Sequence, residues 1–227
     1  MVRTTDGLLR AQRVHAPSDR ARVALVGQTA LLLGGDRVDL EVEVGPDAVL
    51  ELSDIAATVA YHGRGRPASW HTSIRLDPGA RLTYAGQPLV VSDGAEVTRT
   101  LEVDLAERSA ARLRETVVLG RAGEVGGWLD TSTVLRRDGV EFCRERLLLD
   151  SHSRDLPGVL AGVRVIDSVL ALGGASPDEA GSGSPGPNRD RRDGFPARPD
   201  VVTYLLPEEG STLTRFLGAG LADSPLC

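Results

Sequence analysis

The sequence predicts a mainly β fold, in which repeated strand-turn-strand units coil into two packed sheets, a β-helix-like sandwich with one or two short helices. Three observations lead to this prediction: apolar residues occupy alternate positions over long stretches, one strand-turn-strand phrase recurs along the chain, and an Asp-Gly pair separates two apolar segments. Period-two alternation is the signature of a strand with one buried face.

The alternation is clearest after Arg37, where charged residues separate several of the apolar ones. The alternating apolar positions are Val38, Leu40, Val42 and Val44, followed by Ala48, Leu50 and Leu52. We therefore expect two consecutive strands here, joined by a turn at Gly45-Pro-Asp47.

The same phrase recurs twice more. The three copies are Val42–Leu52, Ile74–Tyr84 and a degraded copy at Val103–Leu113. Their starts are roughly 30 residues apart, and a period of that length is typical of one supersecondary unit stacked on its neighbours around a continuous core.

A hairpin is predicted after the repeats. Asp138-Gly139 lies between the apolar stretches 128–135 and 140–149, and Asp-Gly in that setting is a strong hairpin signal. One further strand is expected at 163–172.

The residue composition changes in the last third of the chain. Residues 175–199 are rich in Gly, Ser, Pro and Asp and predict a flexible excursion. Beyond it we expect a strand at Val201–Leu206 and a short helix at Ser211–Leu221, because Leu213, Phe216 and Leu217 have helical spacing.

Composition limits both the size and the class of the protein. With 227 residues the chain fits a single domain over 1–227, interrupted by the excursion at 175–199. The net charge of −6 argues against binding nucleic acid or an anionic membrane surface. Two cysteines, the lack of a signal-peptide pattern and the lack of a membrane-spanning apolar run predict a cytoplasmic protein.

No catalytic signature stands out, so we expect no enzyme activity. The sequence has no nucleophile elbow, phosphate-binding loop, HExxH or paired CxxC motif, and Gly63-Arg-Gly-Arg-Pro67 is interpreted as a turn. His62 and His71 are open to two interpretations, a weak surface metal site across a hairpin or solvated loop histidines. Cys143 on a predicted strand is interpreted as a small hydrophobic residue.

Five segments, in this order, resemble the urease accessory protein family UreD, also called UreH. They are Gly34-Gly-Asp36, Ser53–Tyr61, Leu82–Leu89, Glu115–Arg121 and Glu145-Arg-Leu147. The resemblance covers about residues 31–149. Val59 stands where the family usually has Lys, and Tyr84 stands where it usually has Trp.

The resemblance implies a non-catalytic cytoplasmic scaffold with the coiling two-sheet fold. Its implied partners are urease apoprotein and the UreF-like and UreG-like accessory proteins. It implies no tightly bound cofactor, but nickel in transit toward the urease active site. The family's polar positions along that path fall on Asp36, Thr58, Glu115 and Glu145.

Oxygen ligands suit such a path, because thiolates or several imidazoles would hold a late first-row ion too tightly for it to move on. A purely structural interpretation is also open for two of these residues. Glu115 with Arg121 and Glu145 with Arg146 would then be ion pairs or strand-end caps.

Two other functional classes remain as alternatives. A repeat β-helix carbohydrate-active enzyme, such as a polysaccharide lyase, would need a basic groove with several carboxylates and usually a secretion signal. A generic β-sandwich module that binds carbohydrate would need exposed aromatic residues, and Tyr61 with Trp70 is the candidate cluster.

Overall fold

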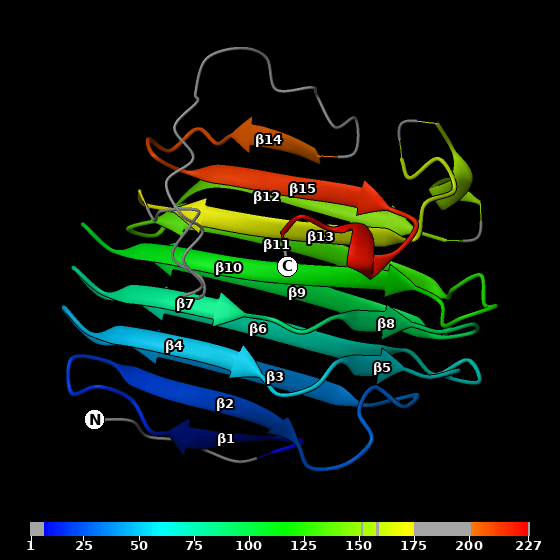
Figure 1. The fold of residues 1–227 in the computed structure, drawn as a ribbon, viewed down its shortest axis with the longest axis horizontal. Helices are drawn as coiled ribbons and strands as arrows, with labels where there is room; N and C mark the ends of the chain where they lie inside the picture. The colour runs from blue at the N-terminus through cyan, green and yellow to red at the C-terminus, as the bar shows by residue number, and fades with distance from the viewer. Residues whose placement is uncertain (1–6, 151, 158, 175–200, 227) are drawn as a thin grey trace.

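Residues 37–119 form three successive coils, each of which places one strand in the smaller of two facing sheets and one or two strands in the larger (Figure 1). The structure is a computed structural model that describes residues 7–150, 152–157, 159–174 and 201–226. The coils consist of β3 (Arg37–Val44), β4 (Val49–Asp54) and β5 (Thr58–Ala60), then β6 (Ala68–Leu76), β7 (Arg81–Ala85) and β8 (Leu89–Val91), then β9 (Glu96–Leu105) and β10 (Ala110–Leu119). The predicted coiling two-sheet fold is confirmed.

Parallel hydrogen bonding holds each coil to the next. In the five-stranded sheet β3, β6, β9 and β11 (Trp128–Arg137) run parallel, and in the ten-stranded sheet β4, β7 and β10 do the same. The turns stack as well, since the amide of Asp47 donates to the carbonyl of Pro78 and that of Gly79 donates to Glu107, both at 3.0 Å. The recurring phrase in the sequence is therefore one coil.

The turns share a backbone conformation that explains their composition. Asp47, Gly79 and Arg108 occupy equivalent positions with φ of 54°, 72° and 58°. This left-handed region favours glycine and tolerates aspartate better than most residues. Only the middle coil has glycine here, so the degraded third copy keeps the turn geometry with a less suitable residue.

After the coil, both sheets continue with antiparallel strands. Asp138 and Gly139, with φ of 50° and 77°, turn β11 back into β12 (Val140–Leu149), which confirms the predicted hairpin. The ten-stranded sheet continues through β13 (Val165–Leu172), β15 (Thr212–Gly218) and β14 (Val201–Leu205), and begins with β1 (Leu9–Val14) and β2 (Ala21–Gly27).

The predicted helix at Ser211–Leu221 is wrong, because most of that segment is the strand β15. Leu213 and Leu217 face the inter-sheet space, whereas Phe216 lies on the opposite face of the strand and is still only 1% exposed. A strand that buries apolar residues on both faces produces spacings of three and four, and these imitate a helix. The short helices of the described chain are two 3₁₀ turns, η1 (Ser153–Asp155) and η2 (Leu221–Asp223).

Residues 221–226 fold back over the outer face of the ten-stranded sheet. The hydroxyl of Ser224 donates to the fully buried carboxylate of Asp167 at 2.6 Å. Arg114 and the Thr116 hydroxyl, both on β10, donate to the same carboxylate. This group of hydrogen bonds fixes the fold-back to the two central strands. The predicted excursion at 175–199 lies outside the described residues.

The inter-sheet space contains two apolar cores rather than one. The first core lies at the end where the turns stack, and it includes Ile74, Ala80, Leu101 and Leu113. The second core lies at the opposite end of the strands, and it includes Trp70, Ala95, Val97 and Val117. Each long strand of the coil therefore contributes to both cores.

Replacing a leucine of the first core by alanine should cost more stability on a central strand than on an edge strand. Leu101 on β9 is 4% exposed, whereas Leu40 on the edge strand β3 is only partly buried. Leu101→Ala should lower the free energy of unfolding by about 2–5 kcal/mol, and Leu40→Ala by roughly half as much. Urea titration of both variants tests this prediction. Equal costs would mean that Leu40 is as well packed as Leu101.

Candidate functional site: a polar layer between the two cores

A layer of polar side chains separates the two cores, and nearly every strand that borders the inter-sheet space contributes to it. On β9, Arg99 lies between the inward residues Val97 of the second core and Leu101 of the first. Glu115 has the corresponding position on β10, between Leu113 and Val117. We use the name polar layer for Asp54, Thr72, the Tyr84 hydroxyl, Arg99, Glu115, Thr131, Thr133, Glu145, Ser168 and Arg215.

Ion pairs across the two sheets organise this layer. Arg99 of the smaller sheet contacts Glu115 of the larger sheet at 2.8 Å, and their side chains are only 16% and 22% exposed. Arg215 on β15 donates two hydrogen bonds, of 2.8 and 2.7 Å, to the carboxylate of Glu145 on β12. Arg215 also donates to the Ser168 hydroxyl at 3.0 Å. The charged groups thus alternate in sign across the interior.

These four charged residues line one cavity of about 50 Å³ between the sheets. Thr131, Thr133 and Ser168 add hydroxyl groups to its wall. A space of this size has room for a few water molecules, and its polar wall provides the hydrogen-bond partners that buried water requires.

The layer continues to Asp54 at the end of β4. Its carboxylate accepts hydrogen bonds from the Tyr84 hydroxyl and from the backbone amide of Gln87, both at 3.0 Å. Burial raises the pKa of Asp54 above its ordinary value, and those hydrogen bonds and the nearby charge of Arg99 oppose the rise. Burial also raises the pKa of Tyr84, which therefore remains a hydrogen-bond donor.

Asp54 also lines a second cavity, of about 250 Å³, with Thr58, Tyr61 and Trp70. Trp70 is 8% exposed and donates its indole N–H to the Thr72 hydroxyl at 3.0 Å. Trp70 therefore faces the interior and offers no aromatic platform on the surface, which weakens the interpretation as a carbohydrate-binding module.

The structure brings two of the four predicted path residues together. Glu115 and Glu145 line the 50 Å³ cavity, and Thr58 lines the larger one. Asp36 lies in the turn before β3, where its carboxylate accepts a hydrogen bond from the amide of Leu33 at 2.9 Å, and it is not part of the wall of either cavity.

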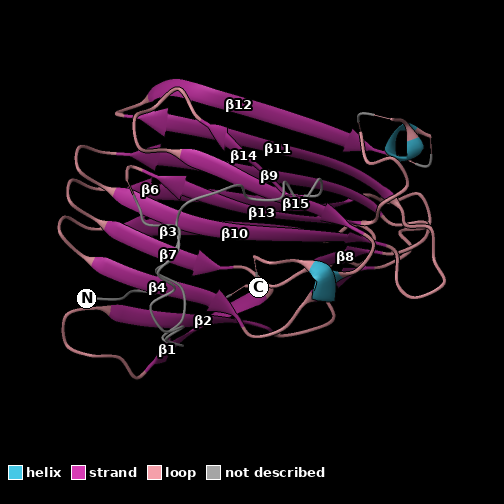
Figure 2. Ribbon diagram, turned by 45° about the horizontal axis from the view of Figure 1, so that its top comes forward, coloured by secondary structure: helices cyan, strands magenta, loops and turns pink. Residues whose placement is uncertain are grey.

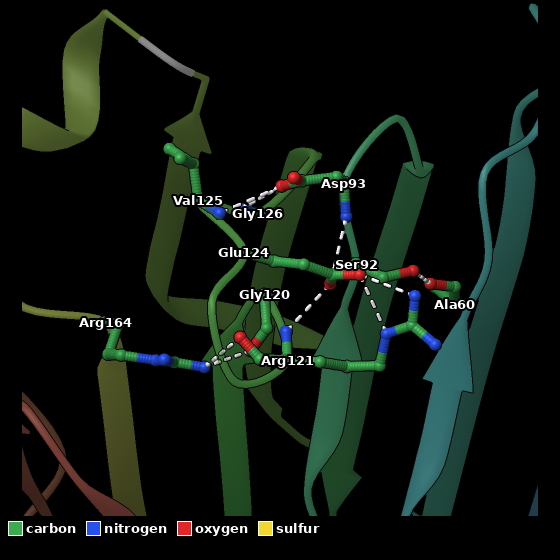
Figure 3. A network of polar contacts seen from close by, with 9 residues as sticks. All are labelled: Ala60, Ser92, Asp93, Gly120, Arg121, Glu124, Val125, Gly126 and Arg164. Carbon is green, nitrogen blue, oxygen red and sulfur yellow. Dashed lines mark hydrogen bonds and ion pairs between the residues drawn. The ribbon is translucent and has the colours of Figure 1, made fainter.

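The arginines next to these glutamates in the sequence are not their partners. Arg121 pairs with Glu124, and Arg146 pairs with Asp130 at 2.7 Å. Figure 3 shows that Arg121 belongs to a loop network in which Asp93 accepts from the amides of Val125 and Gly126. Hydrogen bonds from Arg121 lower the pKa of Glu124 to about 2. This network fixes the loop after β10 and leaves Glu115 to pair with Arg99.

Sequence reasoning missed Asp54, Tyr84, Arg99, Ser168 and Arg215. Arg99 and Ser168 do leave a signal, because each interrupts an inward apolar series at one position, as in Val97-x-Arg99-x-Leu101. Arg215 left no such signal, since its segment resembled a helix. A single polar residue within an alternating strand pattern thus marks a candidate position in a buried layer.

In the described ranges, no group of three or more His, Cys, Asp or Glu residues is placed to hold a metal ion. His62 accepts a hydrogen bond from the amide of Arg64, whereas His71 contacts the Thr100 hydroxyl at 2.5 Å. The helices of the described chain are too short to cross a membrane.

Comparison with known proteins gives a consistent result. Residues 2–220 match the family described as UreD urease accessory protein. The chain is 42% identical over 203 residues to urease accessory protein UreD 1 of Streptomyces griseus. The aligned region covers 89% of this chain and 76% of that protein.

Two further relatives show the same similarity over different extents. UreD 1 of Saccharopolyspora erythraea is 43% identical over 148 residues, which covers 64% of this chain and 58% of the relative. UreD of Frankia casuarinae is 34% identical over 220 residues, covering 91% and 66%. The chain thus spans less than two thirds of the length of these two relatives.

The ion pair between Glu145 and Arg215 predicts a pH-dependent loss of stability. Hydrogen bonds from Arg215 lower the pKa of Glu145 below its ordinary value of 4.5. The pair therefore stabilises the fold above pH 4.5, and this stability is lost as the pH falls through the lowered pKa. Glu145→Gln should cost up to about 1 kcal/mol near pH 7, a small value because the carboxylate is 39% exposed, and almost nothing near pH 2.

Urea titrations of both proteins at a series of pH values test this prediction. Asp54→Asn is the contrasting variant, because the raised pKa of Asp54 means that its ionised form opposes folding at neutral pH. Asp54→Asn should therefore be more stable than the parent at neutral pH, and this advantage should disappear as the pH falls. Parallel curves for Glu145→Gln and the parent would show that the pair contributes nothing.

Proposed function

The chain belongs to the family of UreD urease accessory proteins, and we propose that it is a cytoplasmic scaffold that conducts nickel to the urease active site. In this proposal it binds urease apoprotein and also UreF-like and UreG-like accessory proteins, and it has no catalytic role of its own. The observation that carries the proposal is the polar layer, which places carboxylates and hydroxyls between two apolar cores.

Stability alone is a poor explanation of this layer. Burying ion pairs costs desolvation energy that their attraction only partly returns, so that apolar residues of similar volume often serve the fold equally well. The charged members are three carboxylates and two guanidinium groups. If all are ionised, the layer has an excess negative charge, which favours the entry of a divalent cation.

The ligands of the layer suit a cation that must leave again. Carboxylate, hydroxyl and water oxygens hold nickel less tightly than thiolates or several imidazoles. Cys143 lines the smaller cavity, but burial, together with Glu145 and Glu141, raises the pKa of its thiol. The thiol stays protonated at neutral pH and is therefore a poor metal ligand.

The two arginines weaken cation binding further. A nickel ion that approaches Glu115 or Glu145 must compete with Arg99 or Arg215, each of which already bonds the carboxylate. When the ion moves on, the guanidinium group returns to its partner. We propose that this exchange keeps the residence time of the ion at each carboxylate short.

The proposed path runs from the larger cavity at Asp54 and Thr58 to the smaller cavity at Glu115 and Glu145. Arg99 connects the two, because it pairs with Glu115 and its charge acts on Asp54. Asp36 remains in the proposal as a more peripheral position, in the same turn segment as Leu31 of the larger cavity.

Removing the charge of Glu115 tests the path in cells. Glu115→Gln should lower the nickel content and activity of urease severalfold when the variant is co-expressed with urease and its accessory proteins. Glu102→Gln is the matched control, because Glu102 pairs with Arg136 on the outer face of the smaller sheet. Asp36→Ala should also lower the nickel content and activity of urease. Wild-type urease activation by Glu115→Gln would refute the path through this cavity.

Removing an arginine tests the competition directly. Arg99→Gln frees the carboxylate of Glu115, so the isolated protein should bind Ni²⁺ more tightly, by about tenfold if one guanidinium contact of roughly 1–2 kcal/mol is lost. Calorimetric titration measures this change, with Arg136→Gln on the outer face as the control. An unchanged affinity would show that Arg99 does not compete with the ion.

A further inference from the structure

The two sheets do not end at the same place, and the larger one extends two strands beyond the smaller. The turn at 45–48 joins β3 directly to β4, so these two strands face each other. In the larger sheet, β2 and β1 continue past β4, but β3 is the last strand of the smaller sheet among the described residues. Figure 2 shows β1 and β2 at the lower end of the molecule, beyond β3.

A groove follows from this overhang. It has a volume of about 210 Å³, and its walls come from β1, β2, β3 and β4. Its lining is mostly apolar and includes Ala11, Val23, Leu25, Leu40 and Leu50. The groove lies where the next strand of the smaller sheet would pack onto the inner face of β2.

Within the described ranges, no strand pairs with the edge of β3 next to this groove. The carbonyls of Asp36 and Val44 accept hydrogen bonds from Ser69 and Asp77, at the two ends of the ladder with β6. In a parallel ladder alternate residues bond to the same neighbour, so the odd-numbered residues of β3 direct their N–H and C=O groups away from β6. These residues are Arg37, Asp39, Glu41 and Glu43.

The exposed side chains along this edge are predominantly acidic. Asp39, Glu41 and Glu43 project from the outer face of β3, and all three are exposed. Arg37 and Arg75 offset part of this charge by pairing with Asp39 and Glu43. Directly opposed strand residues of opposite charge stabilise a sheet, and like charges destabilise it.

We propose that the β3 edge and its groove bind an extended segment of a partner protein in which apolar and basic residues alternate. The segment adds to the smaller sheet as its next strand, with main-chain hydrogen bonds to Arg37, Asp39, Glu41 and Glu43. Its apolar side chains enter the groove, and its basic side chains lie beside the acidic residues of β3. A second copy of this chain is a poorer occupant, because pairing two β3 edges would oppose acidic residues.

This inference is independent of the nickel path, because it uses none of the residues of the polar layer. The probe is a synthetic peptide with an N-terminal fluorescein label, fluorescein-Lys-Val-Arg-Val-Lys-Val-Arg-amide, into which the full chain is titrated. A peptide of the same composition with its three valines in succession is the control. Binding is measured by fluorescence anisotropy, and its location by amide hydrogen exchange. We expect protection of the amides of Asp39, Glu41 and Glu43 only with the alternating peptide.

Two variants test the two components of recognition. Glu41→Pro removes one N–H from the free edge without removing a bond to β6, and an edge strand tolerates such a proline. It should weaken binding at least about tenfold. The double variant Glu41→Lys, Glu43→Lys should likewise reject the basic peptide but bind an otherwise identical peptide with Glu in place of Lys and Arg.

The charge exchange keeps the test decisive even if the proline variant unfolds. Circular dichroism and thermal unfolding first establish which variants are folded. Equal affinity for the alternating and control peptides would overturn the proposal, as would protection elsewhere on the protein. Failure of the lysine variant to gain affinity for the acidic peptide, or no binding of the basic peptide at about 1 mM, would also overturn it.

Discussion

The parallel stacking of one coil on the next is the constraint on which the rest of this structure depends. Each strand of the coil satisfies its backbone groups with the equivalent strand of the neighbouring coil, so residues at the same repeat position are brought side by side. The left-handed turn residues stack because of this register, and so do the apolar positions of both cores. The register also brings some polar residues from distant parts of the chain side by side, since Arg99 lies opposite Thr131 and Thr133 lies opposite Glu145. Thr72 is offset from these residues, because it lies opposite Leu101.

The polar layer changes what the two cores can do. A continuous apolar interior would exclude water and ions, whereas this interior is divided across its middle by groups that form ion pairs and hydrogen bonds. The apolar cores on either side maintain the spacing of the sheets, so the layer does not have to support the fold by itself. Raised pKa values at Asp54 and Tyr84 and a lowered one at Glu145 show that one layer can contain several electrostatic environments. Such variety suits a passage better than a tight binding site, because no single position combines all the strong ligands.

The sequence predicts the coil well and the layer only in part, for physical reasons. Period two and the recurring turn are local properties, so the strands on either side of Asp47 and Gly79 could be predicted directly. The partner of Glu145 is Arg215, 70 residues away, and no local pattern connects them. Arg146 was the nearer candidate, but neighbouring residues on a strand point to opposite faces, so it pairs with Asp130 outside the layer. The segment around Arg215 was mistaken for a helix because burial on both faces of β15 removed the alternation that identifies a strand.

The fold-back at residues 221–226 has a consequence for the order in which the chain assembles during synthesis. Each strand from β4 to β11 except β5 pairs with a strand that precedes it in the sequence, so coils can be added one after another as the chain leaves the ribosome. Asp167 is different, because its Ser224 partner emerges 57 residues later. Until then this carboxylate and the outer face of β13 lack their cover, and the nascent protein presents a surface that a chaperone could hold. Docking of residues 221–226 onto β13, rather than formation of the coil, then covers this carboxylate.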